Sequence, residues 1–307
     1  MKKSPHIALY LFLLLAASQA AFAAPSPVTH KLADKVYAFI GGNGTTNSGF
    51  VITDKGVVLI DAQGPQSRAE ALKTSTRKNT EKPVIYTINT HYHGDHTFGN
   101  QFFKGSRIIS HKETRSLLIS EDAAHRKRFK KFFGPQSLTG FRLTLPEITF
   151  THELRLLSGN MVIIVRYPGT AHTRGDAYVY LPALRIVFAG DILYKGRLPW
   201  LGEGSVKGTI KALEELIALD AEIYVPGHGG IATKQDVIAF RQYLLDLTEE
   251  VMRLKARGKT IKEVSAGIKL PAYSGYLKYR EWLPLNAAAV YRELEQAEAE
   301  AKKAAVE

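Results

Sequence analysis

Three histidines and an aspartate crowd into the segment THYHGDH, residues 90–96. The chain has only ten histidines, yet His91, His93 and His96 stand here together with Asp95. Protonated imidazoles packed side by side repel one another, and buried polar groups need partners. A bound divalent metal ion would satisfy both demands, because imidazole and carboxylate are common metal ligands. The segment therefore predicts a metal site, and with it a fold that brings further ligands to the same place.

Composition limits what kind of metal site this can be. The chain has no cysteine, which excludes a thiolate site and a disulfide framework. Any metal must be held by histidine, carboxylate or backbone oxygen. With 307 residues, of which 45% are hydrophobic and 23% charged, the chain has a globular composition and enough length for a sizeable core.

The first residues are typical of an export signal. A basic start, MKK, precedes the apolar run at residues 7–17, which is too short to span a bilayer comfortably. Ala21-Phe22-Ala23 then forms an A-x-A cleavage pattern, so we expect residues 1–23 to be removed after Ala23. An uncleaved membrane anchor is the alternative. The expected location is the periplasm or the exterior, with no stable membrane anchor after cleavage.

The net charge of +12 raises the question of an anionic partner. The densest basic run is RKRFKKFF, residues 126–133. No recognised nucleic-acid-binding motif surrounds it, so no nucleic-acid partner is expected. The run is interpreted as a solvated helix face, with an anion-steering patch near a site as the alternative. A homodimer is left open.

Strand-like and helix-like segments alternate in two similar halves. Segments rich in β-branched and aromatic residues, broken by Gly and Asp-Lys-Gly turns, predict strands. Apolar residues at helical spacing predict helices. Strands are expected within residues 35–42, 47–62, 83–91, 107–111, 148–169, 177–191 and 222–229, and helices within 67–80, 111–133, 208–219 and from Lys234 onward.

Three further candidate ligands stand at the ends of predicted strands. His172 lies in GTAHTRGD, Asp191 in FAGD and His228 in VPGHG, and each has glycine nearby. Functional residues are often presented from such turns, because a rigid sheet fixes the ends of the loop.

The order His91-x-His93-x-Asp95-His96, His172, Asp191, His228 resembles the metallo-β-lactamase-fold hydrolase superfamily over about residues 30–232. The resemblance implies an α+β fold, an αββα four-layer sandwich of two mixed β-sheets flanked by helices. It assigns residues 24–232 to the catalytic domain. Residues 233–307 would form a C-terminal helical extension, either packed on the core or making a dimer contact.

The resemblance also implies a site with two divalent metal ions, zinc being favoured. His91, His93 and His172 would bind the first metal. Asp95, His96 and His228 would bind the second, and Asp191 would bridge both opposite a bridging hydroxide. Asp95 and Asp191 are the candidate catalytic residues.

Three other residues take supporting roles by the same resemblance. Asp61, at the end of VVLIDA, would support the histidine-rich loop rather than bind metal. Tyr194 stands where some lactonases of the superfamily place a substrate-binding tyrosine, with packing as its alternative. Trp200 would line the pocket mouth.

The implied activity is hydrolysis of a small-molecule ester, thioester, lactone or related carbonyl bond by a glyoxalase-II-like, lactonase-like or quinoprotein-associated enzyme. Asp191 and the lack of cysteine point away from a dedicated β-lactamase, which stays an alternative. A persulfide-dioxygenase-like oxidoreductase with one iron is the other.

Overall fold

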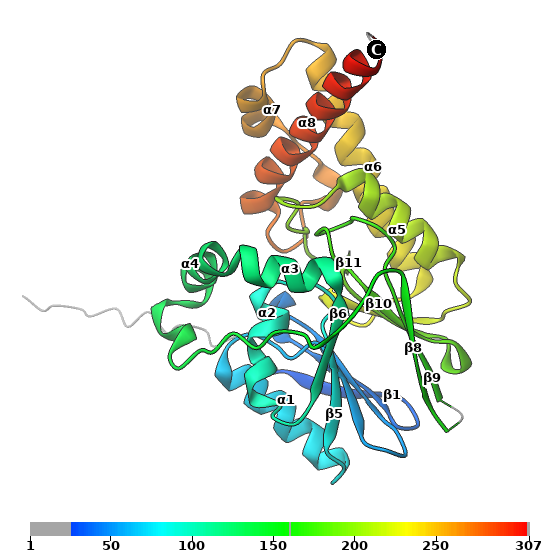
Figure 1. The fold of residues 1–307 in the computed structure, drawn as a ribbon. Coiled ribbons are helices and arrows are strands. Elements are labelled where there is room, and N and C mark those ends of the chain that lie inside the picture. Colours follow the sequence, from blue (N-terminus) through cyan, green and yellow to red (C-terminus); the bar gives the residue numbers. More distant parts are fainter. Residues whose placement is uncertain (1–25, 160, 306–307) are drawn as a thin grey trace, which may run out of the picture.

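The computed structural model describes residues 26–159 and 161–305. The predicted signal peptide, residues 1–23, lies outside this range. Two β-sheets stack face to face, and helices cover their outer faces (Figure 1). Among the described residues, no helix has the length and hydrophobicity needed to cross a membrane. The two stacked sheets and the helices that cover them confirm the α+β class and the αββα sandwich.

The larger sheet has seven strands, which follow one another in space in the order of the chain. Neighbouring strands pair antiparallel up to β4 and parallel from β4 onward. The strands are β1 (Val28–Ala33), β2 (Val36–Ile40), β3 (Ser48–Ile52), β4 (Val57–Ile60), β5 (Val84–Ile88), β6 (Arg107–His111) and β7 (Ile148–Phe150). The sequence did not predict β1, because this edge strand lacks a buried hydrophobic run.

The smaller sheet has five strands in the order β12-β11-β10-β9-β8. Only β11 and β12 pair in parallel. The strands are β8 (Glu153–Ser158), β9 (Met161–Arg166), β10 (Tyr178–Leu181), β11 (Ile186–Tyr194) and β12 (Ile223–His228). β4 and β5 are parallel, and so are β11 and β12. The carboxyl ends of the two strands in each pair therefore lie side by side, at the same end of the sheet.

Alternating side chains explain the four layers. Val58 and Ile60 of β4 face the core between the sheets, whereas Val57 and Leu59 face outward. The outer pair packs with Leu72 of α1 (Gln66–Asn79). Successive side chains of a strand point to opposite faces, so an all-apolar strand such as VVLI can bury both faces under neighbouring layers.

The remaining helices are α2 (Gly94–Thr97), α3 (Lys112–Ser120), α4 (Asp122–Phe133), α5 (Val206–Ala218), α6 (Lys234–Ala256), α7 (Ile261–Gly267) and α8 (Tyr279–Ala304). Short 3-10 turns are η1 (Gly42–Gly44), η2 (Phe98–Phe102), η3 (Pro135–Leu138), η4 (Pro182–Leu184) and η5 (Pro271–Tyr273). The stretch expected as one helix over residues 111–133 is divided at Glu121, whose ψ of 2° leaves the helical range.

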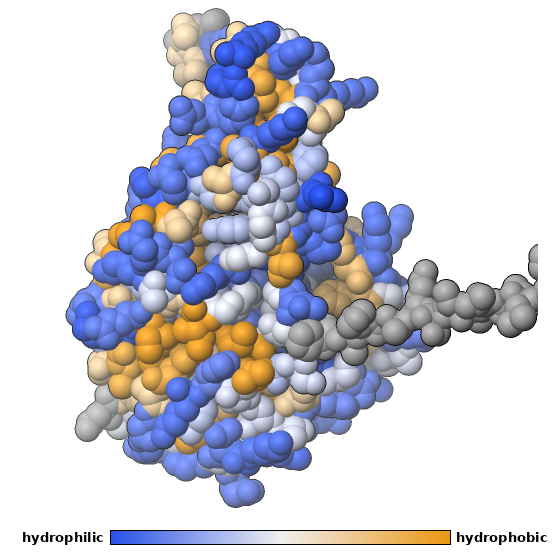
Figure 2. Space-filling view, turned by 180° about the vertical axis from the view of Figure 1, so that it is seen from behind, coloured by the Kyte–Doolittle hydropathy of each residue, from blue (hydrophilic) through white to orange (hydrophobic). Residues whose placement is uncertain are grey.

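The C-terminal helices share a core with the sandwich. One continuous cluster of buried side chains joins Leu193 of β11, Leu213 of α5, Leu244 of α6, Val264 of α7 and Val290 of α8. Figure 1 shows these helices rising from one end of the sandwich. On the rear face, hydrophobic side chains gather mainly over the sandwich, and the helical part is mostly hydrophilic (Figure 2). The extension thus packs on the core, and the boundary near residue 232 stays a prediction.

Candidate metal centre

All seven predicted ligands come together at one end of the sandwich. His91 and His93 follow β5, and Asp95 and His96 belong to the short helix α2. From the other sheet come three more residues: His172 precedes β10, Asp191 lies in β11, and His228 ends β12. Asp191 was expected in a turn. Instead β11 continues past it to Tyr194, and its register against β12 shifts around Gly190, whose φ is +52°.

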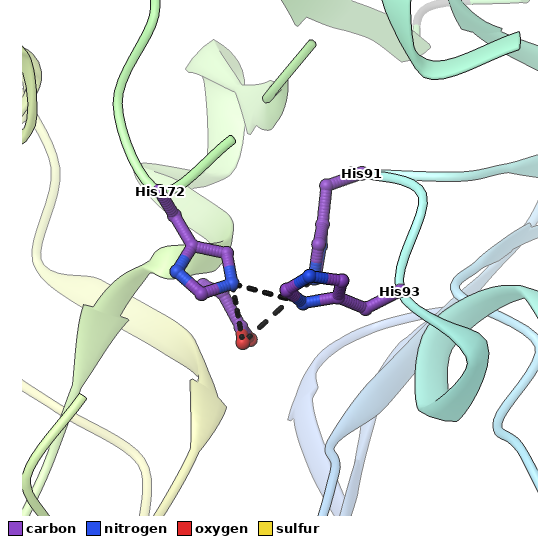
Figure 3. Close-up of side chains that lie close together, drawn as sticks. His91, His93 and His172 are labelled. Atoms are coloured by element: carbon purple, nitrogen blue, oxygen red, sulfur yellow. Dashed lines mark hydrogen bonds and ion pairs between the residues drawn. The ribbon is translucent and has the colours of Figure 1, made fainter. Parts of the chain in front are cut away.

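The first group of ligands contains His91, His93, His172 and Asp191. One donor atom from each lies within 4.8 Å of the others. His172 Nε2 is 3.0 Å from His93 Nδ1, and Asp191 Oδ2 is 3.4 Å from His172 Nε2 and 3.7 Å from His91 Nε2. Figure 3 shows the three imidazoles converging from two separate segments of chain.

The second group contains Asp95, His96 and His228, whose donor atoms also lie within 4.8 Å. Asp95 Oδ2 is 3.6 Å from His96 Nε2 and 3.4 Å from His228 Nε2. Asp191 approaches this group as well, because its Oδ1 is 3.1 Å from His96 Nε2 and its Oδ2 is 3.4 Å from His228 Nε2. The Asp191 carboxylate therefore lies between the two groups.

Several inward-facing atoms lack the hydrogen bonds that buried polar groups require. His91 Nε2, His96 Nε2 and Asp191 Oδ1 are fully buried without a hydrogen-bond partner among the described residues. Such orphaned atoms are rare in native proteins. Coordination to metal ions would satisfy all three, and nitrogen and oxygen donors of this kind suit zinc. The residues present thus fit a metal centre.

Burial and neighbouring charges shift the pKa values of the candidate ligands in different directions. Burial, followed by the neighbouring His96, lowers the pKa of His91 well below its usual value. Burial also lowers the pKa of His172 to about 4. Burial alone would raise the pKa of Asp191, but the surrounding histidines, His228 first, hold it well below its usual value. His91 and His172 therefore favour the neutral imidazole and Asp191 the ionised carboxylate. At His96 and His228, by contrast, the charges of Asp191 and neighbouring carboxylates outweigh burial and raise the pKa of both imidazoles.

Asp61 lies behind the histidines and supports them. It is buried, directly after β4, with a left-handed φ of +58°. It accepts hydrogen bonds from the backbone N–H of Thr90 (2.8 Å) and the hydroxyl of Thr90 (2.8 Å), and lies 2.7 Å from His96 Nδ1. A carboxylate at Nδ1 holds the proton there, which leaves Nε2 of His96 free to face the centre.

Two further histidines of the site are also held from outside, by groups that the sequence did not single out. His93 Nε2 lies 3.1 Å from Glu203 Oε2, and His228 Nδ1 lies 3.0 Å from the carbonyl oxygen of Gly44. These contacts join segments more than a hundred residues apart. The only signal in the sequence was the glycine-rich loop GGNG at residues 41–44, which had no predicted role.

Tyr194 packs against the centre. Its hydroxyl donates to Asp191 Oδ2, and its ring stacks on His228 with centroids 5.2 Å apart. Burial, followed by the charge of Asp191, raises the pKa of Tyr194 well above its usual value, so the phenol stays a proton donor. On the opposite side, the hydroxyl of Thr46 donates to Asp95 Oδ2 at 2.6 Å. The substrate-binding role of Tyr194 stays a prediction.

A pocket of about 250 Å³ opens onto the metal centre. Trp200 lines it, in the place that the sequence suggested. Aromatic residues of α4 and α8 form further walls, and three basic side chains reach into it. The lining residues are Thr45, Thr46, His93, Asp95, His125, Arg128, Phe129, Phe132, Phe133, Asp191, Tyr194, Arg197, Trp200, His228, Lys278 and Trp282.

Helix α4 gives the basic run two different faces. Lys127, Lys130 and Lys131 are exposed, as a solvated helix face requires. Arg128 instead faces the pocket and forms an ion pair with Glu203 at 2.8 Å. His125, on the same helix, is buried and accepts a hydrogen bond from the Gly94 N–H at 2.9 Å.

The comparisons with known proteins agree with this geometry. A family model of the metallo-beta-lactamase superfamily matches residues 41–228, a stretch that holds all seven candidate ligands. The chain belongs to this superfamily. It is a hydrolase of that group, with a candidate metal-binding site.

Among curated relatives, the chain is 26% identical over 239 residues to a metallo-beta-lactamase type 2 of Elizabethkingia meningoseptica, covering 74% of this chain and 86% of the relative. It is 25% identical over 203 residues to a metallo-beta-lactamase type 2 of Bacillus cereus, covering 64% and 72%.

Two solved structures illustrate how far the fold is shared. The metallo-beta-lactamase from Pontibacter korlensis aligns with a TM-score of 0.60 and 23% identity, over 72% of this chain and 100% of that chain. The sec-alkylsulfatase Pisa1 from Pseudomonas sp. aligns with a TM-score of 0.68 and 18% identity, over 87% of this chain and 50% of that chain. The second alignment covers 87% of this chain, which is more than residues 26–232 make up. The shared fold therefore includes part of the helical extension.

Proposed function

We propose that this protein is an exported hydrolase that uses two zinc ions to cleave an ester, thioester, lactone or related carbonyl bond in a small molecule. The position of Asp191 carries this proposal. Its two carboxylate oxygens face His91 and His172 of one ligand group and His96 and His228 of the other. A carboxylate between two cations would offset their mutual repulsion.

The ligand groups divide in a simple way under this proposal. His91, His93 and His172 would hold the first ion, and Asp95, His96 and His228 the second. Asp191 would contact both. When bound, such a pair of ions supplies Lewis acidity and lowers the pKa of coordinated water toward neutrality.

The chain's own residues then supply orientation and proton handling. Asp95 uses its Oδ2 for Thr46 and the histidines, so its Oδ1 is the atom proposed to take the proton from an attacking water. Tyr194 donates to Asp191 and keeps that carboxylate in place. The aromatic side chains Phe129, Trp200 and Trp282 line the pocket and reduce access of bulk water.

Hydrolysis of a β-lactam ring is the second candidate, because both curated relatives described above are metallo-beta-lactamases type 2. The absence of cysteine and the presence of Asp191 favour the ester and lactone class over it. Imidazole and carboxylate ligands also bind iron, so metal analysis must distinguish a single iron ion from two zinc ions.

The test combines metal analysis with a hydrolysis panel on the purified mature protein. The panel contains a homoserine lactone, a thioester, an aryl ester, a cephalosporin and a phosphodiester. We expect about two zinc ions per chain and turnover of the lactone, ester or thioester. Cephalosporin turnover alone would favour the second candidate. One iron per chain, with no hydrolysis and oxygen uptake on a persulfide, would overturn the proposal.

A further inference from the structure

We propose that the C-terminal extension and the loop after β11 together complete the substrate pocket with an anion-binding wall. This wall consists of Arg197, Trp200, Lys278 and Trp282. It would select substrates that carry a negatively charged group attached to an apolar body, with the scissile bond at the metal centre. The inference rests on the proposed hydrolase function and names the substrate class for the same site.

Backbone pairing fixes the extension against the metal-site loop. Leu277 forms an isolated β-bridge with Arg197. The N–H of Leu198 donates to the Leu277 carbonyl at 3.0 Å, and the N–H of Leu277 donates to the Gly196 carbonyl at 3.0 Å. Lys278 and Trp282 follow directly at the start of α8, and both line the same pocket as residues of α4. The wall is therefore held in place by two reciprocal hydrogen bonds.

The basic residues of the pocket differ in how much of their charge is already neutralised. Arg128 forms an ion pair with Glu203 at 2.8 Å, so its charge is largely neutralised within the protein. Lys278 lies 3.2 Å from Glu281, but both side chains are about half exposed, and water screens such a pair. Arg197 forms no ion pair within residues 26–159 and 161–305. Arg197 and Lys278 are therefore the two cations available to an anion.

Arg197 is also positioned before any ligand arrives. One of its terminal nitrogens donates to the Gly44 carbonyl, the oxygen that also contacts His228 Nδ1. Its guanidinium carbon lies 4.6 Å from the centroid of the Trp282 ring. Its Nε is buried without a hydrogen-bond partner in the described structure. A guanidinium placed over an aromatic ring retains donors for a carboxylate or similar anion.

The rest of the pocket favours an apolar body beside that charge. Trp200 and Trp282 meet edge to face with centroids 5.8 Å apart. Across from them, Phe132 and Phe133 of α4 line the pocket while 57% and 41% exposed. Large aromatic side chains left open to water around a pocket usually mark a binding surface. A purely polar anion such as inorganic phosphate would leave these aromatic surfaces uncovered.

The experiment measures binding of two fluorescent probes of similar size to the metal-loaded full mature chain. 1-Anilinonaphthalene-8-sulfonate is anionic and N-phenyl-1-naphthylamine is neutral. We expect the anionic probe to bind about tenfold more tightly than the neutral one. Lys278→Gln and Arg197→Gln should each remove most of this preference, whereas Trp282→Ala should weaken both probes. Lys211→Gln, an exposed lysine of α5, is the matched control and should change neither.

Arg197→Lys keeps the charge if Arg197→Gln disturbs the loop, and should retain part of the preference. Equal affinities for the two probes would overturn the proposal. So would an anionic preference that disappears on metal removal but survives Lys278→Gln and Arg197→Gln, because the anion would then sit on the metal ions. The binding assay needs no turnover, so a failure of the hydrolase proposal would be seen separately in the substrate panel.

Discussion

Substituting Asp61 offers a sharp test of how the histidine loop is held. Asp61 accepts two hydrogen bonds from Thr90 and lies 2.7 Å from His96 Nδ1. Asp61→Asn preserves the shape of the side chain and the left-handed backbone conformation, which asparagine also tolerates. It replaces one oxygen with an NH₂ group, which would donate to His96 Nδ1. The proton of His96 would then move to Nε2, toward Asp191, and block the atom that faces the metal centre.

The two substitutions of Asp61 should differ in how much metal affinity and how much folding stability they cost. Losing an outer hydrogen bond that orients a metal ligand typically costs about 10–100-fold in metal affinity, and we expect Asp61→Asn to do so at the second metal. Asp61→Ala additionally leaves three buried groups without their acceptor, at about 1–3 kcal/mol each. Its free energy of unfolding should fall by roughly 3 kcal/mol or more, measured without metal.

Competition with a chromophoric chelator measures the zinc affinities, and urea unfolding of the metal-free proteins measures stability. Asp61→Asn should fold with nearly unchanged stability and bind the second zinc ion weakly. If it binds both ions as tightly as the parent chain, the tautomer argument for His96 is wrong.

Three further predictions follow from other parts of the molecule. Burial would raise the pKa of Asp236, but the Thr233 N–H and nearby Lys195 lower it. Its stabilising effect is thus present above the ordinary aspartate pKa and lost as pH falls. Asp236→Asn should cost about 1 kcal/mol at pH 7 in urea unfolding, and this cost should shrink as pH falls below the ordinary aspartate pKa; a constant difference would contradict this. Gly227→Ala would place a Cβ 1.9 Å from Asp191 Oδ1, and kcat/KM should fall by about 100-fold; unchanged activity would show that the carboxylate can move freely. Asn286→Ala removes three buried hydrogen bonds of 3.0, 3.1 and 3.3 Å and should lower the free energy of unfolding by about 2 kcal/mol or more. Thermal unfolding measures this loss, and an unchanged midpoint would contradict the prediction.

The ligand positions could be predicted from the sequence because their signals are local. His91, His93, Asp95 and His96 are almost adjacent, and His172 and His228 have glycines nearby where predicted strands end. Parallel pairing of β11 with β12 then brings Asp191 and His228 to one edge of a sheet. The two-sheet architecture followed from the alternation of strand-like and helix-like segments together with the family resemblance.

The supporting contacts could not be predicted, because they join residues that have no local pattern in common. Nothing in the segment PWLGEGS indicates that Glu203 reaches His93, or that the Gly44 carbonyl serves both His228 and Arg197. The edge strand β1 was missed because its largely exposed sequence, VTHKLA, lacks a buried hydrophobic run. The role of the extension in lining the pocket depends on packing between distant helices, which helical periodicity alone does not describe.

Zinc stoichiometry of the mature chain and of Asp191→Ala tests the central claim most directly. The account predicts about two zinc ions per parent chain and about one in the variant, with most hydrolytic activity lost. Full turnover by Asp191→Ala with one tightly bound metal ion would contradict it.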